Sequence, residues 1–387
     1  GTNTGINIPV DLQMVKNANN YACNSTHIYE ADVILKDIDV FVPQGYMEYR
    51  QAQWNGEDHT NTQPLVPEPL QISSELQVHV ASNDISKFAL DNYLNLPLCT
   101  EPDSEGRWIP IDAIPFDKSH LPKQDNFERV WLPYNCRLYP YSYEEFAECT
   151  SKKHNLIHWF GDSNTRRALK KISSMGSWCS KPDEVNTQLC KCNDNAESLG
   201  QQDPRLPMIP INIGPHSKIM HFRWGGLTQI NNPPWLNTFS SDFANITDTP
   251  SVAIFALVNW DVAFSTRSFF IQQVEILLDK ITEYYPSAST EIIVRTGQYY
   301  CCAYDQDIFW KRKFSRLRTL YFNQYITQAF QKRFGNERRV SIWDVSQLSE
   351  RRPYKAREEA AQTCAPNHAR AELVDIENQL LFNRLCN

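Results

Sequence analysis

The chain has 387 residues, of which 41% are hydrophobic, 12% aromatic and 21% charged, and its formal net charge is −7. This composition excludes disorder as the main state, because the apolar residues suffice to build a core that offsets the chain entropy. The acidic balance excludes a basic nucleic-acid-binding surface, so we expect no nucleic-acid partner. The longest apolar run, Val252 to Val258, is far shorter than the roughly 20 residues that a membrane-spanning helix needs.

The first 95 residues are polar, with two segments of strand-like alternation at 32–42 and 76–80. Between these segments lies a stretch of Gln, Asn, Gly and Pro that is typical of a loop. We therefore expect residues 1–95 to form a small β-rich module or elaboration, followed by a second domain at 96–387.

From about residue 150 onward, short apolar runs alternate with segments of helical periodicity. Such alternation predicts an α/β fold with a mainly parallel sheet that helices cover on both faces. The active site of such a fold is expected at the carboxyl ends of the strands. The expected strands are 156–160, 219–224, 251–259, 291–295 and 340–344, and the expected helices are 165–172, 270–285, 314–334 and 371–385.

The eleven cysteines are scattered over the whole length, and Asn24 and Asn245 stand in glycosylation sequons. Together these features favour disulfide bonds and an oxidising compartment, either outside the cell or in the lumen of the endoplasmic reticulum or Golgi. The odd count leaves at least one thiol free or paired with another chain. The first residues show no basic segment followed by an apolar stretch, so a luminal location requires a signal peptide or membrane anchor outside this sequence.

A metal site is the alternative interpretation of the cysteines. Cys190-x-Cys192 and the adjacent Cys301 and Cys302 lack the spacing of structural zinc sites. A disulfide between adjacent cysteines would be strained, which favours separate partners for Cys301 and Cys302. We therefore expect no metal and no cofactor.

Gly161-Asp162-Ser163 follows an expected strand and precedes an expected helix. A serine in this position can present its hydroxyl at the edge of the sheet, and its own N–H near the helix start can face a developing oxyanion. The alternative is that Asp162 or Ser163 simply caps the helix.

Residues 161–166, Gly-Asp-Ser-Asn-Thr-Arg, resemble the GDSxxR motif of the PC-esterase group of the SGNH (GDSL) hydrolase superfamily. That group includes trichome-birefringence-like polysaccharide O-acetyltransferases, Cas1-type glycan O-acetyltransferases and neurexophilin-and-PC-esterase-domain proteins. The resemblance covers roughly residues 95–387 and implies an SGNH-like three-layer α/β/α sandwich. The other matching positions are Cys99, Gly106 to Trp108, Trp131 to Pro133, Cys136, Phe146, His368, Val374, Asn378, Gln379 and Cys386.

The resemblance implies that Ser163 is the nucleophile and that His368 activates it as the base. A serine needs such a base, because its free hydroxyl is a poor nucleophile. The family pattern places an Asp three residues before this histidine, but the chain has Ala365 there. Three explanations stay open: another acid orients the histidine, a Ser-His dyad operates with a backbone carbonyl, or the site is impaired. The acids considered are Asp344, which we favour together with the dyad, and Asp375 and Glu372.

Superfamily members supply oxyanion donors from the nucleophile, a glycine and an asparagine. The corresponding groups would be the Ser163 N–H, an N–H of Gly225 or Gly226, and the side-chain amide of Asn259. The glycine pair can equally form an ordinary turn, and Asn259 can equally form an Asx-turn.

Three further residues are candidates for binding substrate. Arg166 follows the serine, Trp260 follows Asn259, and Arg295 ends an expected strand. The alternatives are a structural salt bridge for Arg166, which we favour, and a place in the core for Trp260.

These observations predict transfer of an acyl group, most simply acetyl, to or from a glycan hydroxyl through an acyl-serine. The partners would be a glycan or polysaccharide acceptor and an acyl donor. We favour an O-acetyltransferase over a carbohydrate O-acetyl esterase, because the resembled families mostly imply transfer. The alternative from another class is a non-catalytic glycan- or protein-binding module that keeps the fold.

Overall fold

The computed structural model describes a large part of the chain. The described residues are 8, 10, 13–14, 29–49, 64–70, 76–80, 90–102, 105–125, 127–177, 208–224, 226–227, 248–286, 289–298, 316–335, 339–352, 369 and 371–387.

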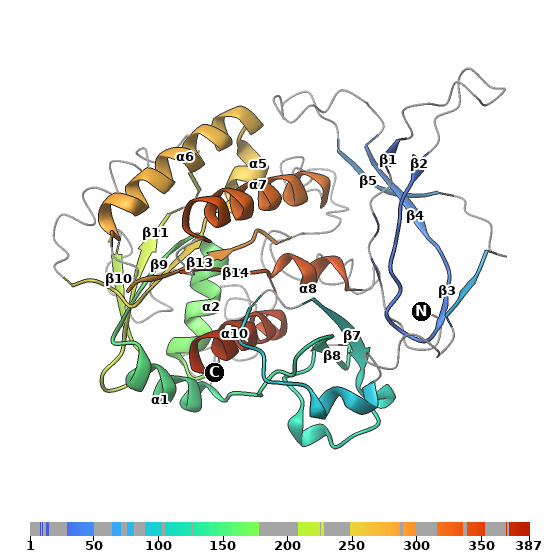
Figure 1. Cartoon of the computed structure of the whole chain (residues 1–387), viewed down its shortest axis with the longest axis horizontal. Coiled ribbons are helices and arrows are strands. Elements are labelled where there is room, and N and C mark those ends of the chain that lie inside the picture. The colour runs from blue at the N-terminus through green and yellow to red at the C-terminus, as the bar shows by residue number, and fades with distance from the viewer. Residues whose placement is uncertain are drawn as a thin grey trace.

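A six-stranded sheet forms the centre of the molecule, with the strand order β10-β11-β9-β12-β13-β14 (Figure 1). Strand β10 runs antiparallel to β11, and the other neighbouring strands are parallel. The sheet confirms the predicted α/β class with a mainly parallel sheet. The strands are β9 (Leu156–Gly161), β10 (Met208–Asn212), β11 (Lys218–Arg223), β12 (Val252–Ala256), β13 (Glu291–Arg295) and β14 (Val340–Trp343).

Helices cover both faces of this sheet, because side chains alternate along each strand. On β9, Ile157 and Trp159 enter the core beneath α1 (Tyr143–Lys153), α2 (Ser163–Ser173) and α10 (Ala371–Cys386). Figure 1 shows these three helices on one side of the sheet and a second group of helices on the other.

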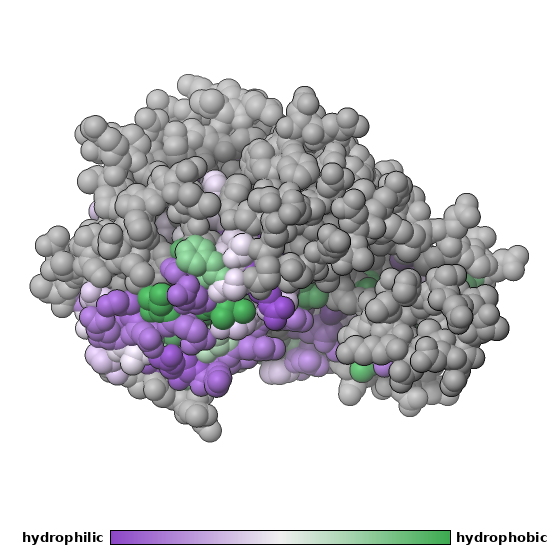
Figure 2. Space-filling model, turned by 90° about the horizontal axis from the view of Figure 1, so that it is seen from above, coloured by the Kyte–Doolittle hydropathy of each residue, from purple (hydrophilic) through white to green (hydrophobic). Residues whose placement is uncertain are grey.

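The opposite core forms beneath α5 (Val258–Phe264), α6 (Arg267–Tyr284) and α7 (Arg316–Phe334). Phe160 of β9 and Phe255 of β12 stack there with ring centroids 4.9 Å apart. The two cores with the sheet between them make a three-layer α/β/α arrangement. Figure 2 shows the side on which α6 and α7 lie, where most of the described surface is hydrophilic and a few apolar side chains are scattered.

A hairpin extends this domain at the carboxyl end of β14. It consists of β7 (Gly106–Pro110) and β8 (Arg129–Pro133), which pair antiparallel. The Trp108 indole N–H donates to the Leu348 carbonyl of α8 (Ser346–Glu350) at 2.8 Å. Buried indole N–H groups need such partners, so this bond fixes the hairpin on α8.

Three two-stranded antiparallel pairs make the N-terminal region β-rich: β1 with β2, β3 with β6, and β4 with β5. The predicted loop between 42 and 76 is wrong in part, because β4 and β5 pair there. Asp37 joins this region to the hairpin through an ion pair with Arg107 at 3.0 Å and a hydrogen bond from Tyr134 at 2.7 Å. The strands are β1 (Gln13–Met14), β2 (Tyr29–Glu30), β3 (Val40–Phe41), β4 (Gly45–Tyr49), β5 (Pro64–Leu70) and β6 (Val78–His79).

The expected strand 251–259 is also wrong at its end. Strand β12 stops at Ala256, and α5 begins at Val258 after Leu257 leaves the extended conformation (φ −123°, ψ 7°). Asn259 therefore lies in the first turn of a helix and not at the end of a strand. A short, uniformly apolar run does not distinguish strand from helix by periodicity, which explains the error.

Two disulfides join described cysteines: Cys99 with Cys136, and Cys149 with Cys386. The second joins α1 to the last turn of α10. The other seven cysteines, Cys190, Cys192, Cys301 and Cys302 among them, lie outside the described residues. Within the described part of the chain, none of the helices combines the length and the apolar character of a membrane span.

Candidate active site

The five parallel strands follow the chain order 2-1-3-4-5 across the sheet, with β9 as the first and β12 as the third. In open α/β sheets of this order, ligands bind at the carboxyl edge between strands one and three, where the connections turn in opposite directions. Ser163 follows β9 and Asn259 follows β12, so both residues lie at this position.

Ser163 is the first residue of α2, and Asp162 is its N-cap. The Asp162 carboxylate accepts the backbone N–H of Asn164 at 2.9 Å and that of Thr165 at 3.4 Å. These bonds satisfy two of the N–H groups that a helix start leaves without intrahelical partners. The predicted capping role of Asp162 is therefore present, and it fixes the helix turn that presents Ser163, whose exposed fraction is 9%.

Gly161 has a steric reason to be glycine. A Cβ at this position would lie 2.9 Å from the Ala256 carbonyl oxygen and closer still to the Thr165 hydroxyl. The strand end, the neighbouring strand and the first turn of α2 are thus packed so tightly that a side chain would displace one of them.

Asn259 faces the same helix start from the first turn of α5, which follows the neighbouring strand β12. Its amide nitrogen donates to the Asp162 carboxylate at 3.2 Å, and its amide oxygen accepts the backbone N–H of Gln298 at 2.9 Å. Because one end of the amide donates and the other accepts, these two bonds fix its orientation. The amide nitrogen has a second hydrogen, which can donate to a substrate oxygen.

Asp162 is completely buried, and burial raises the pKa of its carboxyl above the ordinary value. The Arg295 charge and the Asn259 hydrogen bond oppose this rise. The carboxyl is therefore held among donors that favour its charged form, although the protein around it excludes water.

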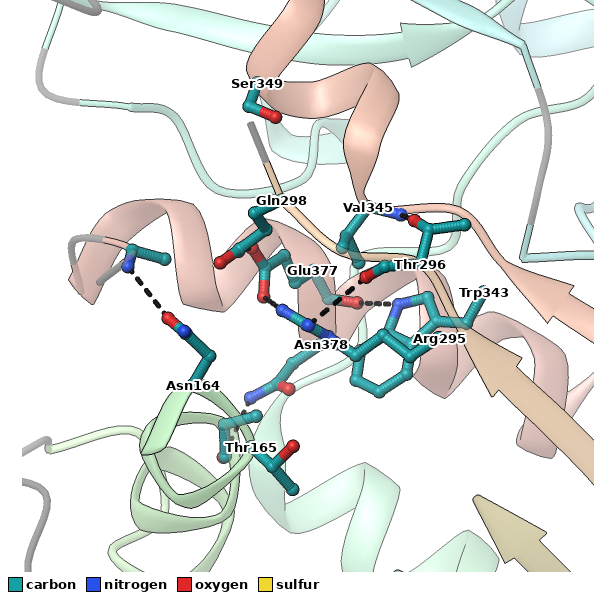
Figure 3. Close-up of polar contacts among 12 residues, drawn as sticks. Asn164, Thr165, Arg295, Thr296, Gln298, Trp343, Val345, Ser349, Glu377 and Asn378 are labelled. Carbon is teal, nitrogen blue, oxygen red and sulfur yellow. Dashed lines mark hydrogen bonds and ion pairs between the residues drawn. The ribbon is translucent and has the colours of Figure 1, made fainter. Parts of the chain in front are cut away.

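His368 lies outside the described residues, but its chain neighbour Ala369 is described. The Ala369 N–H donates to the Asn164 side-chain oxygen at 3.2 Å (Figure 3). Asn164 directly follows Ser163, so Ala369 is bonded to the helix turn that carries the serine.

Asp344, the favoured orienting acid, has a local set of partners. Its carboxylate accepts the Thr296 hydroxyl at 2.9 Å and both the N–H and the hydroxyl of Ser346, at 3.1 and 2.6 Å. Its second oxygen accepts the Gln347 amide at 2.9 Å. Within the described residues these bonds join Asp344 to Thr296, which follows β13, and to α8 rather than to α2.

The other two acids lie on α10. Asp375 is buried and pairs with Lys171 at 3.0 Å and with the Tyr143 hydroxyl at 2.6 Å, which places it between α2 and α1. Glu372 is half-buried in the first turn of α10. None of the described contacts identifies the acid that would replace the aspartate of the family pattern.

Of the glycine pair, Gly225 lies outside the described residues and Gly226 lies against α5. A Cβ on Gly226 would be 2.9 Å from the Asp261 carboxylate, which also accepts the Leu227 N–H at 3.0 Å. The turn after β11 is therefore packed on the helix that carries Asn259.

The three candidate substrate-binding residues differ in exposure. Arg166 and Trp260 are half-buried, and each follows its catalytic candidate on the same helix turn. Arg295 is only 1% exposed, and its guanidinium pairs with Glu377 of α10 at 2.8 Å. This burial favours a supporting role for Arg295 over direct contact with substrate.

Glu377 and Gln298 were missed by the sequence analysis. The Gln298 side-chain amide donates to the same Glu377 carboxylate that pairs with Arg295. The available signal was an acidic residue on the apolar stripe of the closing helix, between Val374 and Leu381. Figure 3 shows Gln298, Arg295 and Glu377 converging from β13 and α10.

Both sequon asparagines, Asn24 and Asn245, lie outside the described residues. In the part of the chain that the structure describes, no group of three His, Cys, Asp or Glu residues is arranged to hold a metal ion.

Comparison with known proteins gives no family assignment. No family model and no curated protein matches the chain. Among solved structures, an extracellular lipase from Streptomyces rimosus is similar at 10% sequence identity and a TM-score of 0.24, over 49% of this chain and 80% of the lipase. We base no inference on a likeness of this size.

Proposed function

We propose that the chain is a serine-dependent acyltransferase or esterase of the PC-esterase type, which acts on acyl groups, most simply acetyl, at glycan hydroxyls. One observation carries the proposal. Ser163 begins a helix at the position where the strand order reverses, and the fixed amide of Asn259 faces the same helix turn. This pair supplies a nucleophile and an oxyanion donor at one edge of the sheet.

The chemistry follows from these groups. The Ser163 hydroxyl oxygen attacks the acyl carbonyl, and His368 accepts the hydroxyl proton as general base. The second N–H of the Asn259 amide and the Ser163 backbone N–H donate to the oxygen of the tetrahedral intermediate, with Gly225 or Gly226 as a further donor. Collapse expels the donor alcohol, which takes the proton from His368, and leaves an acyl-serine. A sugar hydroxyl or water then attacks the acyl-serine and repeats the steps in reverse.

The bond between Ala369 and Asn164 supports the choice of His368, because it joins the chain neighbour of that histidine to the neighbour of the serine. The preference for a glycan rests on the GDSxxR resemblance. Transferase and esterase use the same residues and differ in how well the site excludes water from the acyl-serine. The two described disulfides support an extracellular or luminal location as part of the proposal.

The test is labelling with a fluorophosphonate, followed by intact mass and peptide mapping. We expect one adduct on the wild-type chain, on Ser163, and none on Ser163→Ala or His368→Ala. Asn259→Ala should still be labelled, but about 100-fold more slowly, because one oxyanion donor is lost.

Thr165→Ser is a matched control, because it removes only a methyl group in the same helix turn and should keep the wild-type labelling rate. A folded wild-type chain that forms no adduct would contradict the proposal and favour the non-catalytic binding module, for which glycan-array binding is the next measurement. An adduct that persists in Ser163→Ala would place the reactive group elsewhere.

A further inference from the structure

Four charged side chains lie buried beneath the turn that carries Ser163. Asp162 and Glu377 are acidic, Arg167 and Arg295 are basic, and none is more than 2% exposed. Buried charges persist only when they are paired and hydrogen-bonded. The group meets this condition, because two positive members balance two negative ones. Its members come from α2, β13 and α10.

Glu377 connects two of these elements. One carboxylate oxygen pairs with Arg295 at 2.8 Å, and the other accepts the Gln298 side-chain amide (Figure 3). The Glu377 carbonyl also accepts the Trp343 indole N–H at 3.0 Å, so the helix turn around Glu377 is anchored to β14. The carboxylate is thus held at a defined place, and it holds Gln298 in turn.

Gln298 is the residue whose backbone N–H orients the amide of Asn259, at 2.9 Å. Its chain neighbour Gly297 is fixed separately by Asn323, which accepts the Gly297 N–H at 2.7 Å and donates to its carbonyl at 2.9 Å. A Cβ on Gly297 would lie 3.1 Å from the Asn259 amide oxygen, so the backbone of the loop at residues 296–298 approaches the amide closely. Small shifts of the loop are therefore transmitted to Asn259.

We propose that Glu377 is a positioning residue for the oxyanion site: through the side chain of Gln298, it holds the backbone N–H that orients the Asn259 amide. The inference rests on the proposed function, because the amide matters for rate only if Ser163 reacts. It also explains why an acidic residue occupies the buried stripe of α10, where an apolar residue would otherwise pack.

The first variant is Glu377→Gln. A glutamine is uncharged, so Arg295 loses the buried charge with which it pairs, and the Gln298 amide keeps its bond only if it turns over and accepts instead of donating. We expect the second-order rate of fluorophosphonate labelling to fall about 10- to 100-fold, the range expected for a misplaced catalytic group. The matched control is Asp125→Asn, which also replaces a buried carboxylate by its amide and breaks the ion pair with Arg352 at 3.0 Å, outside the oxyanion site.

The second variant restores the pattern of donors and acceptors. In the double variant Gln298→Glu/Glu377→Gln, the new glutamine can accept from Arg295 and donate to the new glutamate. We expect this exchange to recover most of the labelling rate. Gln298→Met is a third variant, which removes the side-chain donor but keeps the pair between Arg295 and Glu377, so it should fold even if Glu377→Gln does not.

A double-mutant cycle separates positioning from a purely structural role. In the Asn259→Ala background, Glu377→Gln and Gln298→Met should change the labelling rate less than about twofold, because the amide that they position is gone. Equal losses in both backgrounds, or a loss no greater than that of Asp125→Asn, would overturn the inference. A wild-type chain that is not labelled at all would instead overturn the proposed function, and this inference with it.

Discussion

His158 makes the stability of the fold sensitive to acid. This residue lies in β9, only 1% of its surface is exposed, and its Nδ1 is 2.7 Å from the Tyr285 hydroxyl. Burial lowers the pKa of the imidazole to about 3. The perturbation that tests this arrangement is His158→Gln, which keeps a hydrogen-bonding side chain but does not titrate.

The sign and size of the effect follow from the two pKa values. In the unfolded chain the imidazole titrates near the ordinary value of about 6.5. Between that pH and about 3 the unfolded state binds more protons than the folded state, so the free energy of unfolding falls as the pH falls. For the step from pH 7 to pH 5, this linkage removes about 2 kcal/mol from His158 alone.

Urea denaturation of both chains at several pH values isolates this contribution. Other titrating groups change both chains equally, so the difference in the free energy of unfolding reports His158. We expect the wild-type chain to lose about 2 kcal/mol more than His158→Gln between pH 7 and pH 5. Parallel curves for the two chains would refute the reasoning, because they would show that the imidazole becomes protonated without leaving its folded environment.

Two further predictions concern packing and covalent cross-links. Gly161→Ala should lower the free energy of unfolding by about 1–3 kcal/mol, since its Cβ would crowd Thr165 and the Ala256 carbonyl. Adding Thr165→Ala to the Gly161→Ala chain should recover part of that loss. An unchanged melting temperature for Gly161→Ala alone would contradict the packing argument. Removing the disulfide with Cys149→Ser and Cys386→Ser opens a loop with a sequence separation of 237 residues and should cost about 5 kcal/mol in the chain-entropy account. An unchanged urea midpoint would contradict this expectation.

The layers of the main domain were predictable from local patterns of apolar residues. Helical periodicity predicted α6 and α10, because the apolar residues of a helix recur with its period. Apolar runs predicted β9 and β13, because strands covered on both faces are apolar along their whole length. The pair of β4 and β5 was missed because β5 contains Pro64, Pro67 and Pro69, which cannot donate to a sheet ladder and are tolerated only at an edge.

Apart from His368 and Asn259, which the family resemblance supplied, the candidate site was predictable only where its residues are adjacent in sequence. The run of Gly161, Asp162 and Ser163 predicts a strand-to-helix turn, and the structure has that turn. The contacts that orient Asn259 join residues 162, 259, 298 and 377, which no local pattern relates. Those contacts depend on the order of strands in the sheet, which the sequence does not display.

Capture of the acyl-enzyme would show directly whether Ser163 is the nucleophile. Wild-type protein is incubated with 4-nitrophenyl acetate, quenched in acid within the first turnover, digested and analysed by mass spectrometry, with Ser163→Ala treated in parallel. We expect one acetyl group on the peptide that contains Ser163, and its absence from the variant. Acetyl groups confined to lysines and the amino terminus, equal in both proteins, would contradict it.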